Sequence, residues 1–408
     1  MQTNISLEEA QETLLSLAKP TEIEESVRLE ESVGRVLSRV IKAPYQLPPF
    51  SKSPLDGYAL RAEDIEQATP EEPAIIKVIE EIHAGYVAKS EVVAGTTVKL
   101  MTGSPMPKGA DIVIKYEDIE RTADVIRVFQ PLKKDSNVIF AGEDVAIDEV
   151  IANSGDIVTP ALVGALAAVG IAMVPVYKKV DIAILSTGDE LVEPSEALPA
   201  GKIYNSNLHS LRAACATLAT NPIMMGTVDD NKEKIVNKLL AALEISDIVI
   251  TTGGVSVGDY DLVPDAIVEI DAGIIFKGVK LKPGSPIIVA KKQDKFIIAL
   301  SGNAAAATVT FQLMAIPLIK KLMGLKEYFA PTTKAILMSD FKKKSPQRRF
   351  LRGVFQIEYT GNSVTLAGSQ SNGALKSMIG CNALIDIPAG TEPLVKGQVV
   401  SVILTGEL

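Results

Sequence analysis

The chain has 408 residues, of which 47% are apolar and 22% are charged, and this composition excludes a wholly disordered protein. Its 50 acidic residues outnumber its 41 basic ones, which argues against nucleic acid as the main partner. Two cysteines and two histidines are too few for a zinc cluster or a disulfide framework, and they favour a reducing cytoplasm.

The N-terminal part is predicted to contain helices and mixed structure. Its first residues are acidic where a secretion signal would be basic and then apolar, and Ser6 with Glu9 is typical of a capping box. Residues 157–177 carry no charge and are long enough to span a bilayer. Because Pro160 and Gly170 limit the helix to about ten residues, we expect a buried core helix and no membrane span.

The rest of the chain changes its pattern twice. From residue 48 to about 151, short β-like runs are separated by glycine and proline. Apolar strands then alternate with amphipathic helices up to about residue 325, which predicts βαβ units and a mostly parallel sheet. The expected strands are 181–185, 223–228, 247–251, 274–279, 287–290 and 296–300, and the expected helices are 208–218, 231–243, 262–270 and 304–322. Residues 330–408 indicate a small barrel or sandwich.

Three of the expected strands run into glycine-containing turns, at residues 186–190, 252–259 and 301–303. The carboxyl ends of parallel strands meet at one edge of a sheet, and glycine there lets backbone N–H groups approach an anion. One such turn is common in α/β proteins, but three on one edge predict a cofactor-binding site. Its candidate residues are Thr187, Gly188, Gly253, Gly254, Ser256, Gly258, Gly302 and Asn303.

Acidic residues beside these turns predict a Mg²⁺ site, because Mg²⁺ takes one or two carboxylates together with phosphate oxygens. The candidate ligands are Glu190, Asp229, Asp259 and Asp261, whereas Asp230 fits a helix cap equally well. Lys280 and Lys282 would share one face of an extended segment, as cofactor contacts or as a solvated edge. In the cationic run 342–352, only Arg352 is a candidate cofactor contact, because it opens an apolar strand.

Seven ordered motifs resemble those of the molybdopterin molybdenumtransferase family, which includes MoeA and the E domain of gephyrin. They lie at residues 48–59, 102–111, 142–144, 186–191, 251–259, 282–284 and 368–378 and so extend over almost the whole chain. The resemblance implies a multidomain α/β plus β fold with a mostly parallel molybdenum-cofactor-binding domain at 179–326. It also implies a mixed helical N-terminal module at 1–47 and 141–178, an inserted β domain at 48–140 and a C-terminal β barrel at 327–408.

The implied activity is the insertion of molybdenum from molybdate into adenylylated molybdopterin, with Mg²⁺ and with release of AMP. The implied functional residues are Asp56, Thr102, Asp144, Glu190, Asp229, Asp261 and Lys282. Family members are homodimers with the active site between subunits. The molybdopterin adenylyltransferase of the same pathway is a candidate protein partner, and neither nucleic acid nor a membrane is expected.

The sequence departs from the family pattern in three places. Residues 51–53 are Ser-Lys-Ser where the family has Asp-Asn-Ser, Ser285 replaces a lysine, and Ser301 and Ala304 replace prolines. One hypothesis is a charge exchange, in which Lys52 does the work of the lysine missing at position 285. Two alternative functions stay open: a catalytically weak relative that binds the cofactor or acts as a scaffold, and a tungstate-preferring enzyme.

Overall fold

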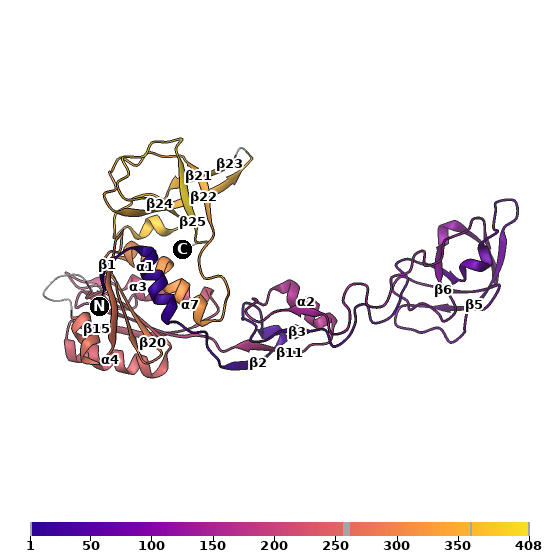
Figure 1. Cartoon of the computed structure of the whole chain (residues 1–408), viewed down its shortest axis with the longest axis horizontal. Helices are drawn as coiled ribbons and strands as arrows, with labels where there is room; N and C mark the ends of the chain where they lie inside the picture. Colours follow the sequence, from indigo (N-terminus) through magenta and orange to yellow (C-terminus); the bar gives the residue numbers. More distant parts are fainter. Residues whose placement is uncertain (1, 256–261, 360, 407–408) are drawn as a thin grey trace.

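The computed structural model describes residues 2–255, 262–359 and 361–406. Figure 1 shows an elongated chain in which an α/β unit and a β barrel lie together at one end. A narrow middle module leads from the α/β unit to a separate β domain at the far end. Both termini lie at the α/β and barrel end.

The α/β unit is built on a seven-stranded sheet with the order β1-β17-β19-β20-β16-β12-β15. Six strands run in one direction, and β19 runs against both of its neighbours, so the predicted mostly parallel sheet is confirmed. The strands are β1 Gln2–Ile5, β12 Asp181–Thr187, β15 Asn221–Val228, β16 Ile248–Thr252, β17 Gly273–Val279, β19 Ile288–Lys292 and β20 Lys295–Leu300. The flanking helices include α3 Ser206–Thr217, α4 Lys232–Ile245 and α5 Val263–Glu269.

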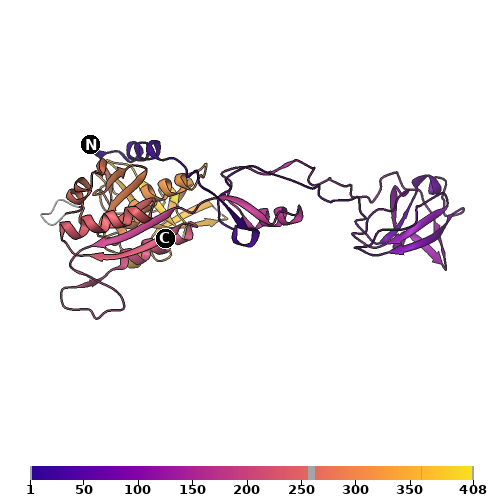
Figure 2. The same cartoon turned by 90° about the horizontal axis from the view of Figure 1, so that it is seen from below.

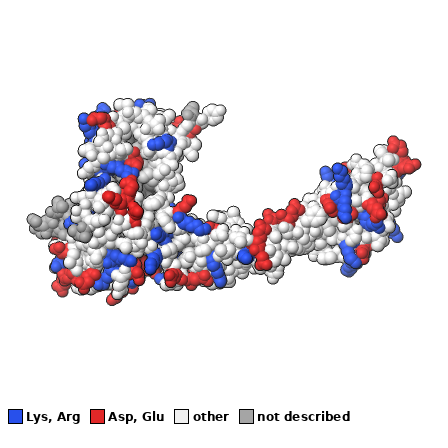
Figure 3. Space-filling view, viewed as in Figure 1, with Lys and Arg blue, Asp and Glu red and all other residues white. Residues whose placement is uncertain are grey.

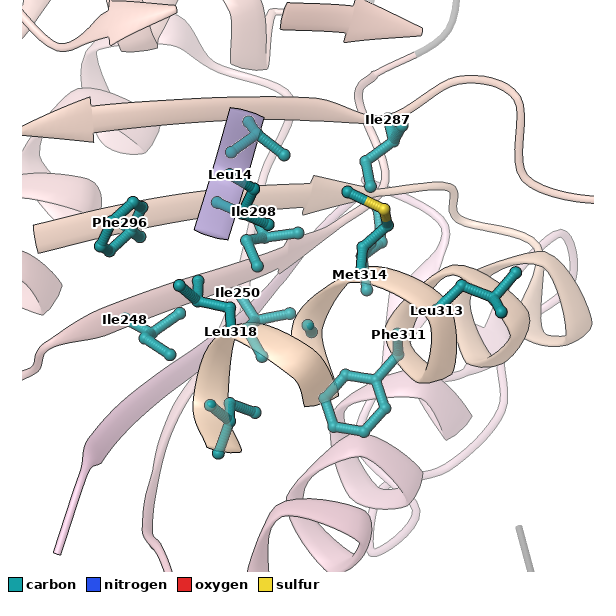
Figure 4. Packing of buried hydrophobic residues seen from close by; sticks show 14 of the residues in the cluster. Leu14, Ile248, Ile250, Ile287, Phe296, Ile298, Phe311, Leu313, Met314 and Leu318 are labelled. Carbon is teal, nitrogen blue, oxygen red and sulfur yellow. The ribbon is translucent and has the colours of Figure 1, made fainter. Parts of the chain in front are cut away.

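The first seventeen residues belong to this unit. Strand β1 pairs with β17, and helix α1 (Leu7–Leu17) buries Leu7 and Leu14 against the sheet (Figure 4). The Ser6–Glu9 capping box is present. The expected N-terminal module at 1–47 therefore does not include these residues, and a four-residue strand that is formed by pairing with the distant β17 leaves no period in the sequence.

The long buried helix of this unit has an irregular turn at its centre. It runs through α6 Ala304–Thr310, a π-helical turn Phe311–Ala315 and α7 Ile316–Leu322. Pro317 has no N–H group to bond to the carbonyl of Leu313, and the Gln11 side-chain amide donates to that carbonyl instead, at 2.7 Å. Within the described residues, this is the one helix long and apolar enough to cross a membrane, and 78% of its most apolar window is buried inside the molecule.

The middle module consists of two small antiparallel sheets and one helix. Strand β2 Glu24–Arg28 pairs with β11 Met173–Tyr177, and β3 Ile41–Lys42 pairs with β10 Val150–Ala152. Helix α2 (Pro160–Ala168) begins at the Thr159 cap and has nine residues, which is far shorter than a membrane span. Only Leu166 of α2 is buried, so the expectation of a fully buried helix is wrong.

The inserted β domain is a six-stranded sheet with the order β7-β4-β6-β5-β9-β8. Its strands are β4 Gly57–Leu60, β5 Ala74–Ile82, β6 Thr96–Leu100, β7 Ile112–Lys115, β8 Ile119–Thr122 and β9 Val125–Val128. Two chain segments connect it to the middle module side by side (Figure 2), and bridges join Leu47 to Val145 and Lys52 to Ile139.

The C-terminal part is a closed five-stranded barrel, because β22 pairs with both β23 and β24. Its strands are β21 Thr332–Leu337, β22 Arg348–Glu358, β23 Gly361–Leu366, β24 Ala383–Ile387 and β25 Val399–Leu404. The short strand β18 (Leu281–Lys282) leaves the α/β unit and pairs with β22, so the barrel is joined to the α/β unit beside the turn at Gly284.

Candidate active site

A cavity of about 460 Å³ lies at the carboxyl edge of the central sheet. Its walls are the three turns predicted from the sequence, together with residues from the β18–β19 connection and one residue from the barrel. The lining residues are Thr187, Gly188, Glu190, Asp230, Gly253, Gly254, Val255, Gly284, Pro286, Ser301, Gly302, Asn303, Ala306 and Asn372. Asn372 was missed because it lies in a barrel loop, where the sequence gives no sign of its distance from the sheet.

The turn at Gly253 and Gly254 packs so closely against the turn at Thr187 that a larger residue would not fit at either glycine. Gly253 and Gly254 have φ angles of 95° and 64°, in the left-handed region. A Cβ atom on Gly253 would lie 2.3 Å from the carbonyl oxygen of Thr187. The hydroxyl of Thr187 is buried at the cavity wall and has no hydrogen-bond partner among the described residues. A buried polar atom without a partner is costly, so this hydroxyl is suited to a bound ligand.

A buried polar network supports the turns from behind. The Ser186 hydroxyl donates to Asn205 Oδ1 at 3.1 Å and lies 2.8 Å from the Thr252 hydroxyl. The Asn205 side chain also caps α3 by accepting from Leu208 N. The same helix holds the third turn, because Asn207 Nδ2 donates to the Gly302 carbonyl at 2.8 Å. The turns therefore form one cross-linked rim.

Glu190 and Asp230 bring negative charge to this rim. The Glu190 carboxylate folds back over Gly188, where a Cβ atom would lie 2.4 Å from Glu190 Oε2. Asp230 lines the cavity and accepts a hydrogen bond from Asp189 N at 3.4 Å, while Asp230 N donates to Asp189 Oδ1 at 3.0 Å. The helix-cap interpretation of Asp230 is wrong, because Asn231 caps α4.

Asp229, the predicted metal ligand, is an exposed residue that is not among the cavity-lining residues. Its carboxylate accepts a hydrogen bond from Lys234 and forms an ion pair with it, and this contact holds the pKa of Asp229 below its ordinary value. Asp229 directly follows β15 and Asp230 lies at a bend before α4, so the two adjacent carboxylates have different surroundings.

The predicted basic contacts do not line this cavity. Lys282 is exposed on β18. Lys280 and Ser285 line a second cavity, of about 670 Å³, between α1 and the barrel. The Ser285 hydroxyl donates to the Val279 carbonyl at 2.9 Å, and Lys52 bridges Pro105 and Ile139 near the inserted β domain. The charge-exchange hypothesis requires positions 52 and 285 to line the same pocket. Within one chain they do not, because Ser285 lies beside the barrel and Lys52 lies near the inserted β domain.

Arg352 is 1% exposed inside the barrel. Its guanidinium donates to the Ser377 hydroxyl at 2.8 Å and to the Ser369 and Ser371 carbonyls at 2.8 and 3.1 Å. Burial lowers the pKa of Arg352. The arginine thus fixes the loop that carries Asn372 to the cavity, and its own nitrogen atoms bond to barrel groups.

Asp56, Thr102 and Asp144 lie away from the cavity. Asp56 Oδ1 accepts hydrogen bonds from Thr102 N at 2.7 Å and from Thr102 Oγ1 at 2.8 Å, and these bonds hold the pKa of Asp56 below its ordinary value. Both residues flank strands of the inserted β domain, at the far end of the chain from the central sheet (Figure 1). Asp144 lies in the connecting segments, where its N–H group bonds to the Leu47 carbonyl at 3.0 Å.

Four predicted site residues, Ser256, Gly258, Asp259 and Asp261, fall outside the described residues. Among residues 2–255, 262–359 and 361–406, no group of three or more His, Cys, Asp or Glu side chains is arranged to hold a metal ion. On the face drawn in Figure 3, basic side chains are interspersed with acidic ones, unlike the continuous basic surface of a nucleic-acid-binding protein.

Comparison with family models gives three matches that follow one another along the chain. Residues 5–170 match the MoeA N-terminal region (domains I and II), residues 183–321 match a probable molybdopterin binding domain, and residues 334–405 match the MoeA C-terminal region (domain IV).

Relatives match at full length. A molybdopterin molybdenumtransferase of Staphylococcus aureus is 35% identical over 93% of this chain and 91% of its own length. Two crystal structures of the molybdopterin biosynthesis MoeA protein from Pyrococcus horikoshii have TM-scores of 0.87 and 0.85. Their identities are 30% and 33%, and the alignments include 99% and 98% of this chain and 100% of each solved chain. The chain therefore belongs to the molybdopterin molybdenumtransferase family.

Proposed function

We propose that this chain transfers molybdenum from molybdate to adenylylated molybdopterin and that AMP is released. The observation that carries the proposal is the cavity at the sheet edge, where three turns meet around the buried hydroxyl of Thr187, which bonds to no other group in the described part of the chain. Both substrates are anions that carry oxygen acceptors. Backbone amides in glycine turns and a desolvated hydroxyl are the donors that such groups require.

Different residues of the cavity would bind different parts of the substrate. The turns at Gly188, Gly253 and Gly302 allow close approach of backbone to phosphate oxygens. Ser301, Asn303 and Asn372 add neutral donors and acceptors, which suit a polar pterin edge. Because displacement at phosphorus depends on positioning and charge stabilisation, the site does not require a protein nucleophile.

Glu190 and Asp230 would hold Mg²⁺. The described lining residues include these two carboxylates and no lysine or arginine, so binding a phosphate there requires a cation. Mg²⁺ commonly takes one or two protein carboxylates and completes its coordination shell with water and phosphate oxygens. The two carboxylates of the cavity match this coordination. When bound, Mg²⁺ would neutralise charge on the leaving AMP. Asp230 takes the place that the sequence analysis gave to Asp229.

The active form is proposed to be a homodimer. Helix α2 is apolar on all sides, yet its Ala161, Gly164 and Ala167 are exposed. An apolar helix face of this kind favours burial against another subunit. A two-fold dimer would also allow Asp56 and Thr102 of one subunit to approach the cavity of the other. Lys282 and Asp144 remain candidates for that shared site.

The state of the two cysteines supports a location in the cytoplasm. Cys215 and Cys381 are free and buried, which suits a reducing cytoplasm. The adenylyltransferase that makes the adenylylated substrate is the proposed protein partner, because direct transfer would protect a reactive intermediate from water.

The test is incubation of the purified chain with adenylylated molybdopterin, Mg²⁺ and molybdate, followed by measurement of AMP. We expect AMP release that requires both the chain and molybdate. Glu190→Gln is the matched inactive variant, and its melting temperature should stay within about 2 °C of wild type because Glu190 is exposed. AMP release no faster than in a reaction without protein would refute the proposal.

A further inference from the structure

The segment that carries Glu190 is a long loop, here called the strap (residues 189–204), which projects from the α/β unit (Figure 2). Its two ends are paired as β13 (Leu191–Val192) and β14 (Ile203–Tyr204). The Ile203 N–H group donates to the Glu190 carbonyl at 2.8 Å. The backbone position of Glu190 therefore depends on how the strap is held.

At its first residue the strap is hydrogen-bonded to Asp230 through Asp189, and beyond β13 the side chain of Glu193 makes a second attachment to the rest of the fold. Glu193 Oε2 lies 3.0 Å from His209 Nε2 on α3, and Glu193 Oε1 accepts from the Thr227 hydroxyl of β15 at 3.5 Å. The side chains of Glu193 and His209 are 34% and 43% exposed, so the contact is half-buried. It joins the strap to one helix and to one edge strand.

The same contact reaches the rim of the cavity. The Thr227 hydroxyl accepts from Asn205 Nδ2 at 3.1 Å, and Asn205 belongs to the buried network with Ser186 and Thr252 behind the turns. Glu193 is thus the outer end of a continuous hydrogen-bonded chain. Glu190 and Glu193 directly precede and directly follow the two-residue strand β13 in the sequence.

We propose that Glu193 is a positioning residue, which with His209 clamps the strap so that the Glu190 carboxylate is held at the cavity. This inference rests on the proposed role of Glu190. Without the clamp, β13 and β14 would remain paired with each other and held at their ends, by the Asp189–Asp230 hydrogen bonds and by Asn205, but the strap would lose its attachment to α3 and β15 beyond β13 and would move more. The Glu190 carboxylate would then be spread over many positions, which weakens cation binding and slows any step that needs a fixed geometry.

The experiment compares Glu193→Ala, which removes the clamp, with Glu193→Gln, which keeps one acceptor oxygen and places a donor NH2 group where the second carboxylate oxygen was, so that hydrogen bonds to His209 and Thr227 can still form. Glu196→Gln is the matched control, since it makes the same charge change on the strap and its carboxylate accepts a hydrogen bond from within the strap, from Glu193 N at 3.4 Å. Lys202 is the single basic residue of the strap, so the rate of trypsin cleavage there reports strap opening. We expect cleavage to rise at least about fivefold in Glu193→Ala and to stay near wild type in the other two variants.

A second readout uses the two histidines of the chain, His83 and His209. Their ring NMR signals are assigned with His83→Gln. In Glu193→Ala the His209 signal should shift, and the His83 signal, in the inserted β domain, should not. These two measurements need no substrate, so they test the clamp even if AMP release fails.

The third readout is the kinetics of AMP release, measured as kcat and as the dependence on Mg²⁺ concentration. Glu193→Ala should raise the Mg²⁺ concentration for half-maximal AMP release and lower kcat at least about fivefold, with an unchanged melting temperature and with recovery in Glu193→Gln. Wild-type cleavage at Lys202 in Glu193→Ala would overturn the clamp. A loosened strap with wild-type kcat and Mg²⁺ dependence would overturn the positioning role. No AMP release by the wild-type chain would count against the proposed function alone.

Discussion

Asn207 holds the turn at Gly302 from behind, through a hydrogen bond of 2.8 Å from its side-chain amide to the glycine carbonyl. The side chain is 9% exposed and belongs to the first turn of α3, which Asn205 caps. One helix start therefore organises two walls of the cavity, since Asn205 bonds to Ser186 behind the first turn.

Replacing Asn207 with leucine keeps the branched shape of the side chain, at a larger volume, and removes the hydrogen bond to the Gly302 carbonyl. We expect a loss of about 1 kcal/mol in the free energy of unfolding and a larger proportional loss in AMP release, because the turn at Gly302 becomes free to move. The control is Thr217→Ala at the other end of α3, where the hydroxyl bonds only within the helix to the Ala214 carbonyl. Equal effects of the two variants on AMP release would contradict the role of Asn207.

The adjacent carboxylates Asp229 and Asp230 should behave differently. Asp230 lines the cavity, whereas Asp229 is exposed and paired with Lys234. Asp230→Asn should raise the Mg²⁺ concentration needed for half-maximal AMP release at least about tenfold, and Asp229→Asn should change it less than about twofold. Isothermal titration of Mg²⁺ into both variants checks the same ranking without turnover. A stronger effect at Asp229 would restore the ligand assignment made from the sequence.

Sequence patterns were informative where the structure is local. Strands β12, β16 and β20 are apolar runs that end in glycine turns, and helices α3 and α4 begin at asparagine caps, so the positions of these elements and the shared edge were predicted correctly. The Ser6–Glu9 capping box was also predicted correctly, because its two hydrogen bonds join residues three positions apart.

Patterns were uninformative where a side chain depends on a distant partner. The pairing of β1 with β17 joins the start of the chain to residues 273–279. Asn372 lines the cavity from a barrel loop that bonds to the distant Arg352 and to Ala305 N, and nothing local distinguishes it from other loop asparagines. The assignment of Arg352 itself remains a prediction, and its surroundings suggest a supporting role rather than direct contact with the cofactor.

Arg352 should therefore matter for the stability of the barrel. Lysine cannot reproduce three hydrogen bonds from a planar fork, so Arg352→Lys should weaken the bonds to the Ser369 and Ser371 carbonyls and to the buried Ser377 hydroxyl. We expect the barrel to lose about 2–4 kcal/mol of stability. Hydrogen exchange of the β22 and β24 amides measures this loss for the barrel alone. An unchanged exchange rate together with lost AMP release would instead indicate direct contact with substrate.

The buried thiol of Cys215 should make the free energy of unfolding decrease as the pH rises above 9. Burial raises the pKa of the Cys215 thiol to about 12, from an ordinary value near 9. Above pH 9 the unfolded chain releases a proton that the folded chain keeps, so the contribution is complete below pH 9 and is lost as pH rises toward 12. The urea midpoint should fall between pH 9 and 10.5 more steeply in wild type than in Cys215→Ala. Parallel slopes would show that the thiol titrates alike in both states.

Asp56 and Glu190 should complement each other between subunits. Within one chain they lie in different domains, so a site that needs both must take them from two subunits. Asp56→Asn and Glu190→Gln chains should each be inactive alone. Because half of randomly mixed dimers are hybrids and each hybrid has one intact site, co-expression should restore about a quarter of wild-type AMP release. Hybrids purified through two different affinity tags should reach about half, since every one contains one intact site and one doubly altered site. Inactive hybrids, or a monomer by sedimentation at micromolar concentration, would show that the two residues do not share a site across an interface.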